Sequence, residues 1–205
     1  MLTLLRNHLA ALRMLLVFTV ICGLAYPLVI TGIAQTAFSG QANGSLLKEN
    51  GRTVGSSLIG QSFDLPKKNP DDPNEAARPD PRFFQPRPSA SDYDMLASGA
   101  SNLGPNDPGL VKAIKERRTA VAAFDHVAPA DVPADAVTAS GSGLDPDIST
   151  AYAAEQVARV AQARGLTTAR VRGLVSDNTH GRAAGFLGNS YVDVVTLNLD
   201  LAKIK

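Results

Sequence analysis

The chain has almost no cysteine: among its 205 residues only Cys22 is one, and it lies inside an apolar stretch. A single thiol forms no disulfide within the chain and offers no pair of thiols to a metal ion. We therefore expect the rest of the chain to be held together by its own hydrophobic core. Cys22 itself is interpreted as a small apolar residue.

Charge is also missing from a long part of the chain. Residues 14–47 carry none, and no acidic residue precedes Glu49. Beyond this stretch, 18 Lys and Arg face 19 acids, so that part is close to neutral. Binding to DNA or RNA needs a basic surface that neutralises phosphates. The composition therefore argues against nucleic acid as a partner.

The uncharged stretch contains a predicted transmembrane helix, residues 14–37. Its 24 residues would form a helix ~36 Å long, enough to cross a hydrocarbon core of ~30 Å. Pro27 near the middle predicts a kink, and the small residues around it favour close contact with another helix. The alternative is a cleaved signal peptide, although the apolar run is longer than the usual 7–15 residues and residues 34–37 form a poor cleavage site.

The flanking charges predict the orientation of this helix. Arg6 and Arg13 precede it, whereas the next cation on the other side is Lys48. The positive-inside rule then places residues 1–13 in the cytoplasm and residues 38–205 outside. We predict a single-pass protein of the cell (inner) membrane with a soluble extracytoplasmic (periplasmic) domain.

The outer domain is predicted to begin with a hairpin and a long loop. Residues 46–60 read as two short strands joined at Asn50-Gly51, because this pair suits a turn with two positive φ angles. Residues 64–88 are rich in proline and mixed charge, which excludes a helix or a central strand. Phe83-Phe84 interrupts this polar run, and we expect it to dock the loop on the core.

Three helices are predicted in the middle of the chain. Asp107-Pro108 provides an N-cap and a first-turn proline for an amphipathic helix. Asp145-Pro146 offers the same start to a second helix, with Ser149 as a competing cap, and Gly165 ends that helix. A third, short helix is expected over residues 168–175.

The end of the chain, residues 191–202, is predicted to be a strand, because β-branched residues alternate along it. We expect it to pair with the N-terminal hairpin strands. The fold class is then α+β: one N-terminal transmembrane helix followed by a single mixed α/β extracytoplasmic domain.

Motifs of catalysis and metal binding are absent from the sequence. His8, His126 and His180 show no His-x-x-His or His-Glu-x-x-His spacing, so we predict no metal site. No G-x-S-x-G motif follows a predicted strand. The sequence predicts no enzyme, and a Ser-His-Asp set dispersed along the chain stays open as an alternative.

Two runs rich in Gly and Ser, residues 98–105 and 140–146, draw attention as binding loops. The second is expected directly before a helix N-terminus, where free backbone N–H groups favour an anion such as a nucleotide phosphate. Its spacing fits neither a P-loop nor G-x-G-x-x-G. We favour a flexible turn capped by Asp145, whose own charge repels phosphate.

Short motifs follow the apolar helix in a characteristic order. They are VGSSLIGQSF, FFQPRPSASDYD, ASGASNLGPNDPGL, DAVTASGSGLDPDIS, AAEQVARVAQARGL and GFLGNSYVDVVTLNLDL. Each motif is short, but together, over residues 1–201, they resemble the C subunit (KdpC family) of the Kdp potassium-transporting P-type ATPase. The segment 64–82 is longer than the family pattern leads us to expect.

The resemblance implies a non-catalytic subunit of a high-affinity, ATP-driven potassium uptake pump. Its implied partners are a channel-like potassium-binding subunit, a P-type subunit that hydrolyses ATP, and a small single-span subunit. The C subunit of this family stabilises the assembly and is described as a catalytic chaperone that raises the ATP affinity of the P-type subunit. ATP is thus the implied cofactor, and the implied nucleotide region is Ser140, Gly141, Ser142, Gly143 and Gln156.

The predicted orientation conflicts with direct ATP contact, because an extracytoplasmic domain does not meet cytoplasmic ATP. Two alternatives to the pump subunit are carried forward. One is a stand-alone, membrane-anchored extracytoplasmic binding module whose Gly/Ser loops line a pocket. The other is an anchored hydrolase that uses a dispersed Ser, His and Asp set.

Overall fold

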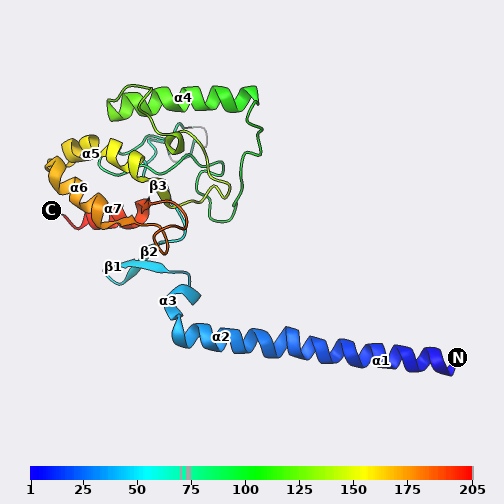
Figure 1. Cartoon of the computed structure of the whole chain (residues 1–205). Helices are drawn as coiled ribbons and strands as arrows, with labels where there is room; N and C mark the ends of the chain where they lie inside the picture. Colours follow the sequence, from blue (N-terminus) through cyan, green and yellow to red (C-terminus); the bar gives the residue numbers. More distant parts are fainter. Residues whose placement is uncertain (70, 73–74, 205) are drawn as a thin grey trace. The chain divides into compact units, whose positions relative to one another are not determined.

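A computed structural model describes residues 1–69, 71–72 and 75–204 of the chain (Figure 1). Residues 70, 73 and 74, within the predicted 64–88 loop, and the last residue of the predicted 38–205 domain lie outside the described residues. The chain divides into two units, Met1–Leu46 and Leu47–Lys205. We call the second unit the head. The described elements are mixed α and β and follow one N-terminal apolar helix, which confirms the predicted α+β class.

The first unit is dominated by one continuous apolar helix. It runs through α1 (Leu2–Phe18), a π-helical segment (Thr19–Ala25) and α2 (Tyr26–Ala37). This 36-residue helix has a mean hydropathy of 2.3 in its most apolar window, and by length and composition it is able to cross a membrane. The predicted segment, residues 14–37, lies within it. A short α3 (Ser39–Ala42) follows.

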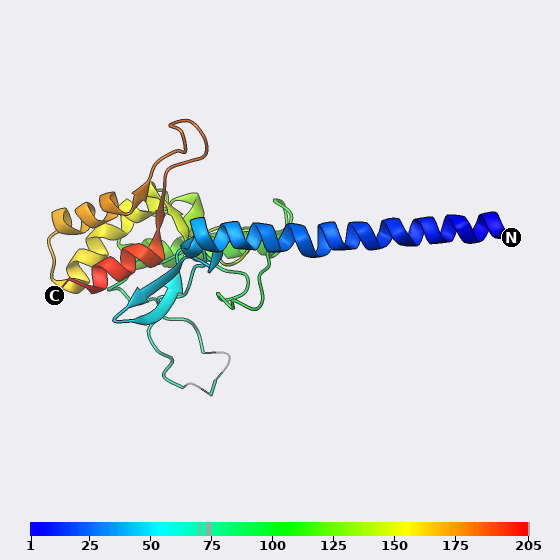
Figure 2. The ribbon, with the colours of Figure 1, turned by 90° about the horizontal axis from the view of Figure 1, so that it is seen from below.

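Pro27 is accommodated differently from the predicted kink. A proline inside a helix donates no hydrogen bond to the residue four positions before it and crowds that carbonyl. Here the turns just before Pro27 widen into the π-helical segment, which relieves this crowding. In Figures 1 and 2 the helix continues through this segment without an abrupt change of direction.

The predicted hairpin is present as β1 (Leu46–Glu49) and β2 (Arg52–Ser56), and all of it except Leu46 belongs to the head. Asn50 and Gly51 have φ angles of 49° and 80°. Both values lie in the left-handed region that this pair was predicted to adopt.

The long loop after the hairpin is anchored by its paired aromatics, as predicted. Phe84 is fully buried in the main hydrophobic cluster. The amide group of Asn198 binds both backbone polar groups of Phe84: its Oδ1 accepts from Phe84 N at 2.9 Å, and its Nδ2 donates to Phe84 O at 2.9 Å. Phe83 is half-buried and packs on Phe63, with ring centroids 5.7 Å apart. A segment without regular secondary structure thus forms part of the core.

Helix α4 (Pro108–Asp125) starts where the sequence predicted. The Asp107 carboxylate accepts from Gly109 N and Leu110 N, and Pro108 occupies the first turn. Ala122 is buried and Val121 packs against the main cluster, so one face of the helix meets the core. A short 3₁₀ turn, Ala134–Ala136, follows.

The predicted helix start at Asp145-Pro146 is wrong. Strand β3 (Asp147–Ser149) comes first. Helix α5 (Thr150–Arg164) is capped by Ser149, the alternative cap, whose side chain accepts from Tyr152 N. Gly165 ends α5 with φ +66°, as predicted. Helix α6 (Thr168–Asp177) extends two residues past its predicted end.

The predicted strand over residues 191–202 is wrong beyond its third residue. Only β5 (Tyr191–Asp193) is a strand, and α7 (Val194–Ala202) follows it. Asp193 accepts from Thr196 N and so caps the helix. Val194, Leu197 and Leu201 lie at helical spacing and are all fully buried. A helix places these three side chains on one face toward the core, whereas a strand would divide the segment between its two faces.

The sheet of the head is a three-stranded antiparallel one with the order β3-β5-β4, in which β4 is Thr179–His180. The hairpin β1-β2 forms its own two-stranded sheet. The expected pairing between the first and last strands is therefore wrong: β5 pairs with β3 and β4. Helices α5 and α7 pack with this sheet around the cluster that holds Phe84.

Candidate functional site

The Gly/Ser turn of the implied nucleotide region is closed by its own hydroxyls. Ser140 Oγ accepts from Gly143 N at 2.9 Å, and Ser142 Oγ accepts from Leu144 N at 3.1 Å. Gly141 and Ser142 are exposed, whereas Gly143 is buried. Two of the backbone N–H groups that a phosphate cradle would use thus already have partners within the turn.

The two Gly/Ser runs singled out in the sequence meet in the structure. Gly99 N and Ser98 Oγ both donate to Ser142 O, at 2.8 and 3.0 Å. Ser89 Oγ donates to Gly143 O at 2.7 Å. Gly143 is needed at this point, because an added Cβ would collide with the other segment where the two approach each other.

Gly143 tests this close approach. It has φ +69°, and a Cβ added there would lie 2.7 Å from Gly99 O and 2.8 Å from Ser91 Oγ. We expect Gly143→Ala to lower the free energy of unfolding of the head by about 1–3 kcal/mol. Gly141→Ala is the matched control, because an added Cβ there meets nothing within 4 Å; its effect should stay within about 0.5 kcal/mol. Urea denaturation followed by circular dichroism measures both, and equal effects would contradict this account.

The less favoured alternative, an anion site at a helix N-terminus, does not form next to the Gly/Ser turn, because β3 separates the turn from α5. Asp145 instead accepts from Asp147 N at 3.0 Å and pairs with Arg87, Nη1 to Oδ2, at 3.0 Å. At the true start of α5, the Asp135 carboxylate accepts from both Ser149 N and Ser149 Oγ. A carboxylate at this position repels a phosphate.

Gln156 lies in the core, with no exposed surface. Its Oε1 accepts from Gln85 N and from Arg159 Nη2, both at 2.6 Å, and its Nε2 donates to Gln85 O at 3.0 Å. The side chain thus acts as a clamp between α5 and the loop that contains Phe84. No hydrogen bond among those in the described residues joins it to residues 140–143.

Arg159 is the centre of a buried polar cluster that our sequence analysis missed. Its Nε pairs with Asp125 Oδ1 at 2.5 Å, and the two side chains are only 4% and 2% exposed. Its Nη1 donates to the carbonyls of Pro81 and Phe83 at 2.8 and 2.9 Å. The guanidinium also lies 4.4 Å from the centre of the Phe124 ring. One side chain therefore ties α4, α5 and the proline-rich loop together.

A signal for this cluster was present in the sequence. Tyr152, Gln156 and Arg159 follow one another at spacings of four and three, so they share one face of α5. All three are buried in the structure. A polar stripe on a helix that also has an apolar stripe indicates buried hydrogen bonds.

Glu155 lies beside this cluster, and its charged form destabilises the folded head. Burial, followed by the negative charge of Asp125, raises the pKa of Glu155 to about 7. Among the described residues its Oε1 is buried without a hydrogen-bond partner. The folded head therefore holds a proton on Glu155 at pH values where the unfolded chain has released it.

The sign of the resulting pH dependence follows from linkage. The penalty is complete above the folded pKa of about 7 and disappears as the pH falls toward the ordinary range of a glutamate. We expect Glu155→Gln to raise the Tm of the head by about 2–4 °C at pH 8 and to leave it unchanged at pH 5. Glu116→Gln, on the exposed face of α4, is the control without an effect. A rise of the same size at both pH values would contradict the assignment.

A second acidic pair lies across the sheet. Asp147 and Asp193 are register partners on β3 and β5. Burial first, and then the charges of Asp145 and Asp193, raise the pKa of Asp147 to about 7. Burial also raises the pKa of Asp193, although this residue caps α7. Within the described residues, no group of three or more His, Cys, Asp and Glu side chains is arranged to hold a metal ion.

A groove of about 780 Å³ lies between the proline-rich loop and α4. Arg87, Tyr93, Arg117 and Phe124 contribute to its lining, but Gln156 and the residues of the turn 140–143 do not. Arg87 and Arg117 both donate to backbone carbonyls, those of Thr138 and Val137. This groove is therefore separate from the implied nucleotide region.

The fold and the site together define a class of protein. A small α+β head, whose buried polar groups hold its own elements together, is attached to one apolar helix that is long enough to cross a membrane.

The particular family follows from comparison with known proteins. The sequence profile of the family described as "K+-transporting ATPase, c chain" matches residues 8–203, and the chain belongs to this family. The resemblance inferred from the ordered motifs is thus confirmed.

Similar proteins extend over nearly the whole chain. It is 47% identical over 208 residues to the potassium-transporting ATPase KdpC subunit of Streptomyces coelicolor, covering 95% of this chain and 91% of that protein. The corresponding subunit of Sorangium cellulosum is 51% identical over 194 residues, with 93% and 94% covered. That of Mycobacterium tuberculosis is 47% identical over 203 residues, with 97% and 99% covered.

Proposed function

We propose that this chain is the accessory, non-catalytic C subunit of an ATP-driven potassium uptake pump. The observation that carries this proposal is the family match over residues 8–203. In addition, relatives named as subunits of a potassium-transporting ATPase match this chain along nearly their full length. The structure adds a second support, because Arg159 and Gln156, the buried polar groups most like a functional site, are engaged in holding the fold.

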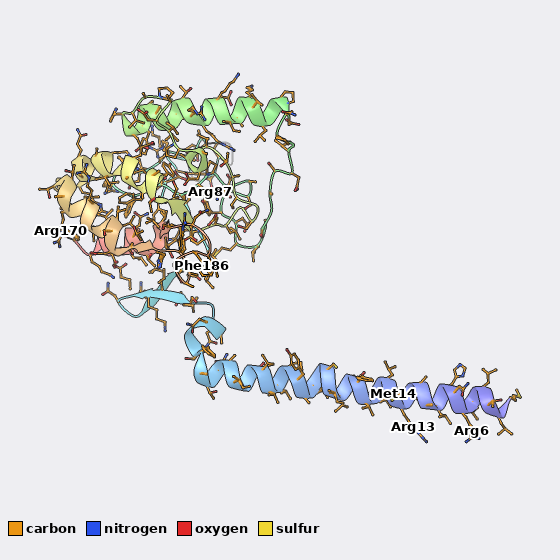
Figure 3. The ribbon with its side chains drawn as sticks, viewed as in Figure 1. Arg6, Arg13, Met14, Arg87, Arg170 and Phe186 are labelled. Carbon is orange, nitrogen blue, oxygen red and sulfur yellow. The ribbon has the colours of Figure 1, made fainter. Side chains whose placement is uncertain are left out.

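The apolar helix is proposed to remain in the membrane and to tether the head beside its partners. Arg6 and Arg13 lie near its N-terminal end (Figure 3), which favours a cytoplasmic N-terminus and an extracytoplasmic head. A reporter fused after Lys205 tests this orientation. Activity of a periplasm-dependent reporter such as alkaline phosphatase is expected, and activity of a cytoplasm-dependent reporter would reverse the orientation.

The proposed partners are a channel-like potassium-binding subunit, a P-type ATP-hydrolysing subunit and a small single-span subunit. The helix offers Gly23 and Gly32 for close contact with a neighbouring helix, since glycines let two backbones approach each other. An added Cβ at Gly32 would meet nothing within 4 Å in this chain, so that position is open to a partner.

A finer proposal is that the subunit acts as a catalytic chaperone that raises the ATP affinity of the P-type subunit. The implied nucleotide region divides into two parts. Gly141 and Ser142 are accessible, whereas Gln156 is enclosed and hydrogen-bonded through both its Oε1 and its Nε2. An extracytoplasmic head also has no access to cytoplasmic ATP. These points favour an effect that reaches the P-type subunit through the membrane helix and subunit contacts.

Steady-state kinetics of the assembled pump distinguishes the two routes. Ser142→Ala removes an exposed hydroxyl of the turn, and we expect it to leave the KM for ATP unchanged. A several-fold rise in that KM, without loss of assembly, would instead support direct contact at residues 140–143.

Potassium uptake tests the main proposal. Cells that lack the gene for this chain, with the other pump subunits intact, are expected to lose growth at micromolar potassium. The wild-type gene should restore it. Normal growth without the gene would contradict the role in the pump. It would favour the stand-alone binding module, for which the groove of about 780 Å³ is the natural site.

A further inference from the structure

The groove of about 780 Å³ between the proline-rich loop and α4 is lined by two polar groups whose hydrogen-bonding capacity the fold does not fill. One side of the groove is a face of α4, where Arg117, Val121 and Phe124 follow one another at spacings of four and three. Arg87, labelled in Figure 3, lines the side that the loop forms. The volume lies within the range of small-molecule sites, about 300–1,000 Å³.

The first of these groups is the hydroxyl of Tyr152. This side chain is only 3% exposed, belongs to the main hydrophobic cluster and lines the groove. Among the described residues its backbone N–H has a partner, Ser149 Oγ, but its hydroxyl has none. The hydroxyl of Tyr93, in the same groove, instead donates to Arg87 O at 2.7 Å. Buried polar groups nearly always have a partner, so the hydroxyl of Tyr152 points to an occupant of the groove.

The second group is the guanidinium of Arg117. Its Nη1 donates to Val137 O at 3.2 Å, and within the part of the chain that the structure describes no carboxylate forms an ion pair with it. Arg87, on the loop side of the groove, is already neutralised by Asp145 at 3.0 Å. A guanidinium without an acidic partner favours an anion, and a carboxylate matches its planar set of donors.

The charges around Tyr152 determine which end of a ligand lies at each group. Burial, followed by the charge of Asp125, raises the pKa of Tyr152 above its ordinary value, so the hydroxyl keeps its proton and can donate. The acids that act on this hydroxyl outnumber the single cation, Arg159. A further negative charge is unfavourable there. The anionic group of a ligand therefore belongs at Arg117, and an uncharged acceptor such as a carbonyl belongs at Tyr152.

Much of the remaining lining is apolar. It includes Pro86, Pro88, Ala120, Val121 and Phe124. An apolar body is favoured against such a surface, and an aromatic ring is suited to contact with Phe124. The chemistry that fits the groove is thus a carboxylate, an uncharged carbonyl and an apolar group in one small molecule.

We propose that the groove binds a small apolar carboxylate of the acylated amino acid type. Its carboxylate pairs with Arg117, its carbonyl accepts from the hydroxyl of Tyr152, and its apolar body packs against Val121 and Phe124. The proposal concerns the head alone, so its failure leaves the role in the potassium pump untouched, and failure of that role leaves the ligand site untouched.

The test is a binding titration of the full chain in detergent, followed by NMR of the probe. N-acetylphenylalanine is the probe, and N-acetylphenylalaninamide, which lacks the negative charge, is its matched control. We expect the amide to bind about tenfold more weakly than the acid, because hydrogen bonds to charged groups are the stronger ones. No binding of the acid, or equal binding of acid and amide, would overturn the proposal and leave only ordered water in the groove.

Arg117→Gln is expected to weaken binding of the acid about tenfold and to remove the preference for the acid over the amide. Arg118→Gln, at an exposed neighbouring position of α4 that does not line the groove, should bind as the wild type does. Unchanged binding in Arg117→Gln would locate the probe elsewhere, for example in the detergent, and would overturn the proposal. If Arg117→Gln lowers the Tm, Arg117→Lys replaces it: this variant keeps the charge and must keep the preference for the acid, and loss of the preference would overturn the proposal.

Tyr152→Phe separates a ligand group from a structural one. We expect it to weaken the acid and the amide alike, roughly 3–10-fold, because both carry the carbonyl that accepts from the hydroxyl. The Tm should be unchanged or higher, since the hydroxyl has no partner among the described residues of the head. A lower Tm with unchanged binding would show that the hydroxyl serves the fold, and would overturn its role in the site.

Discussion

Replacing Phe84 with alanine is expected to lower the free energy of unfolding of the head by about 3–5 kcal/mol. Phe84 has no exposed surface and belongs to the main cluster, with Leu197 and Leu201 of α7. Removing its ring leaves a cavity in a region that side chains from a loop, a sheet and two helices fill together. Asn198 fixes both backbone groups of this residue, so the loop has little freedom to collapse into the cavity.

Thermal and urea denaturation of the full chain in detergent measure this effect through the circular dichroism of the head. Phe186→Ala is the matched control, because the same ring is removed from a side chain that is 72% exposed. Its effect on the isolated chain should stay within about 0.5 kcal/mol. Similar losses for the two variants would show that the loop does not dock through Phe84.

Replacing Arg159 with methionine is expected to cost a similar amount, about 3–5 kcal/mol. Methionine keeps much of the side-chain volume but removes every donor. Asp125 would then be a buried carboxylate without its cation, and the carbonyls of Pro81 and Phe83 would lose a partner. Leaving a charge buried and unpaired is the main cost of breaking such a pair.

A second substitution separates charge from packing. In the double variant Asp125→Leu/Arg159→Met the unpaired carboxylate is gone, so we expect part of the lost stability to return. Arg170→Met, at an exposed position of α6, serves as the control with little effect. If the double variant were less stable than Arg159→Met by the full cost of a second core substitution, the ion pair would not be the source of the loss.

Phe84→Ala and Arg159→Met both affect function, because each lowers the amount of folded subunit. A loss of a few kcal/mol is a large share of the stability of a small protein, and in cells it lowers abundance. Substitution of Gln156 is therefore expected to reduce pump assembly before it changes any property of ATP binding. This distinction affects how loss of activity at this position is interpreted.

Local signals in the sequence predicted much of the fold correctly. Asn50-Gly51 gave the hairpin turn, Asp107-Pro108 the start of α4, and Gly165 the end of α5. In each case the backbone geometry depends on one or two residues, so the local sequence is sufficient to predict it. The apolar helix was equally easy to predict, because uncharged apolar runs of about two dozen residues are rare in soluble domains.

Segments with two competing patterns were predicted less well. Residues 191–202 alternate as a strand does, yet the same residues also place Val194, Leu197 and Leu201 on one helical face. The deciding signal was Asp193, which caps α7. The sequence allowed Asp193 to be a helix cap, but it allowed a strand as well. Packing of the helical face against the core decides between them, and that packing is visible only in the folded chain.

The polar contacts of the site depended on pairs that are distant along the chain. Gln156 meets Gln85, and Asn198 meets Phe84, across separations of 71 and 114 residues. No local pattern specifies such a pair. The resemblance pointed to Gln156 as a nucleotide residue, and the structure places it as a clamp inside the core.

The most direct test of the account is the composition of the particle that contains this chain in the membrane. Membranes are solubilised in mild detergent, and the chain is purified through a tag after Lys205. The account predicts that it remains in the membrane fraction with residues 1–37 intact, and that a P-type ATPase subunit and a channel-like subunit elute with it in constant proportion. A chain recovered from the aqueous fraction, shortened at its N-terminus and free of other subunits, would contradict it.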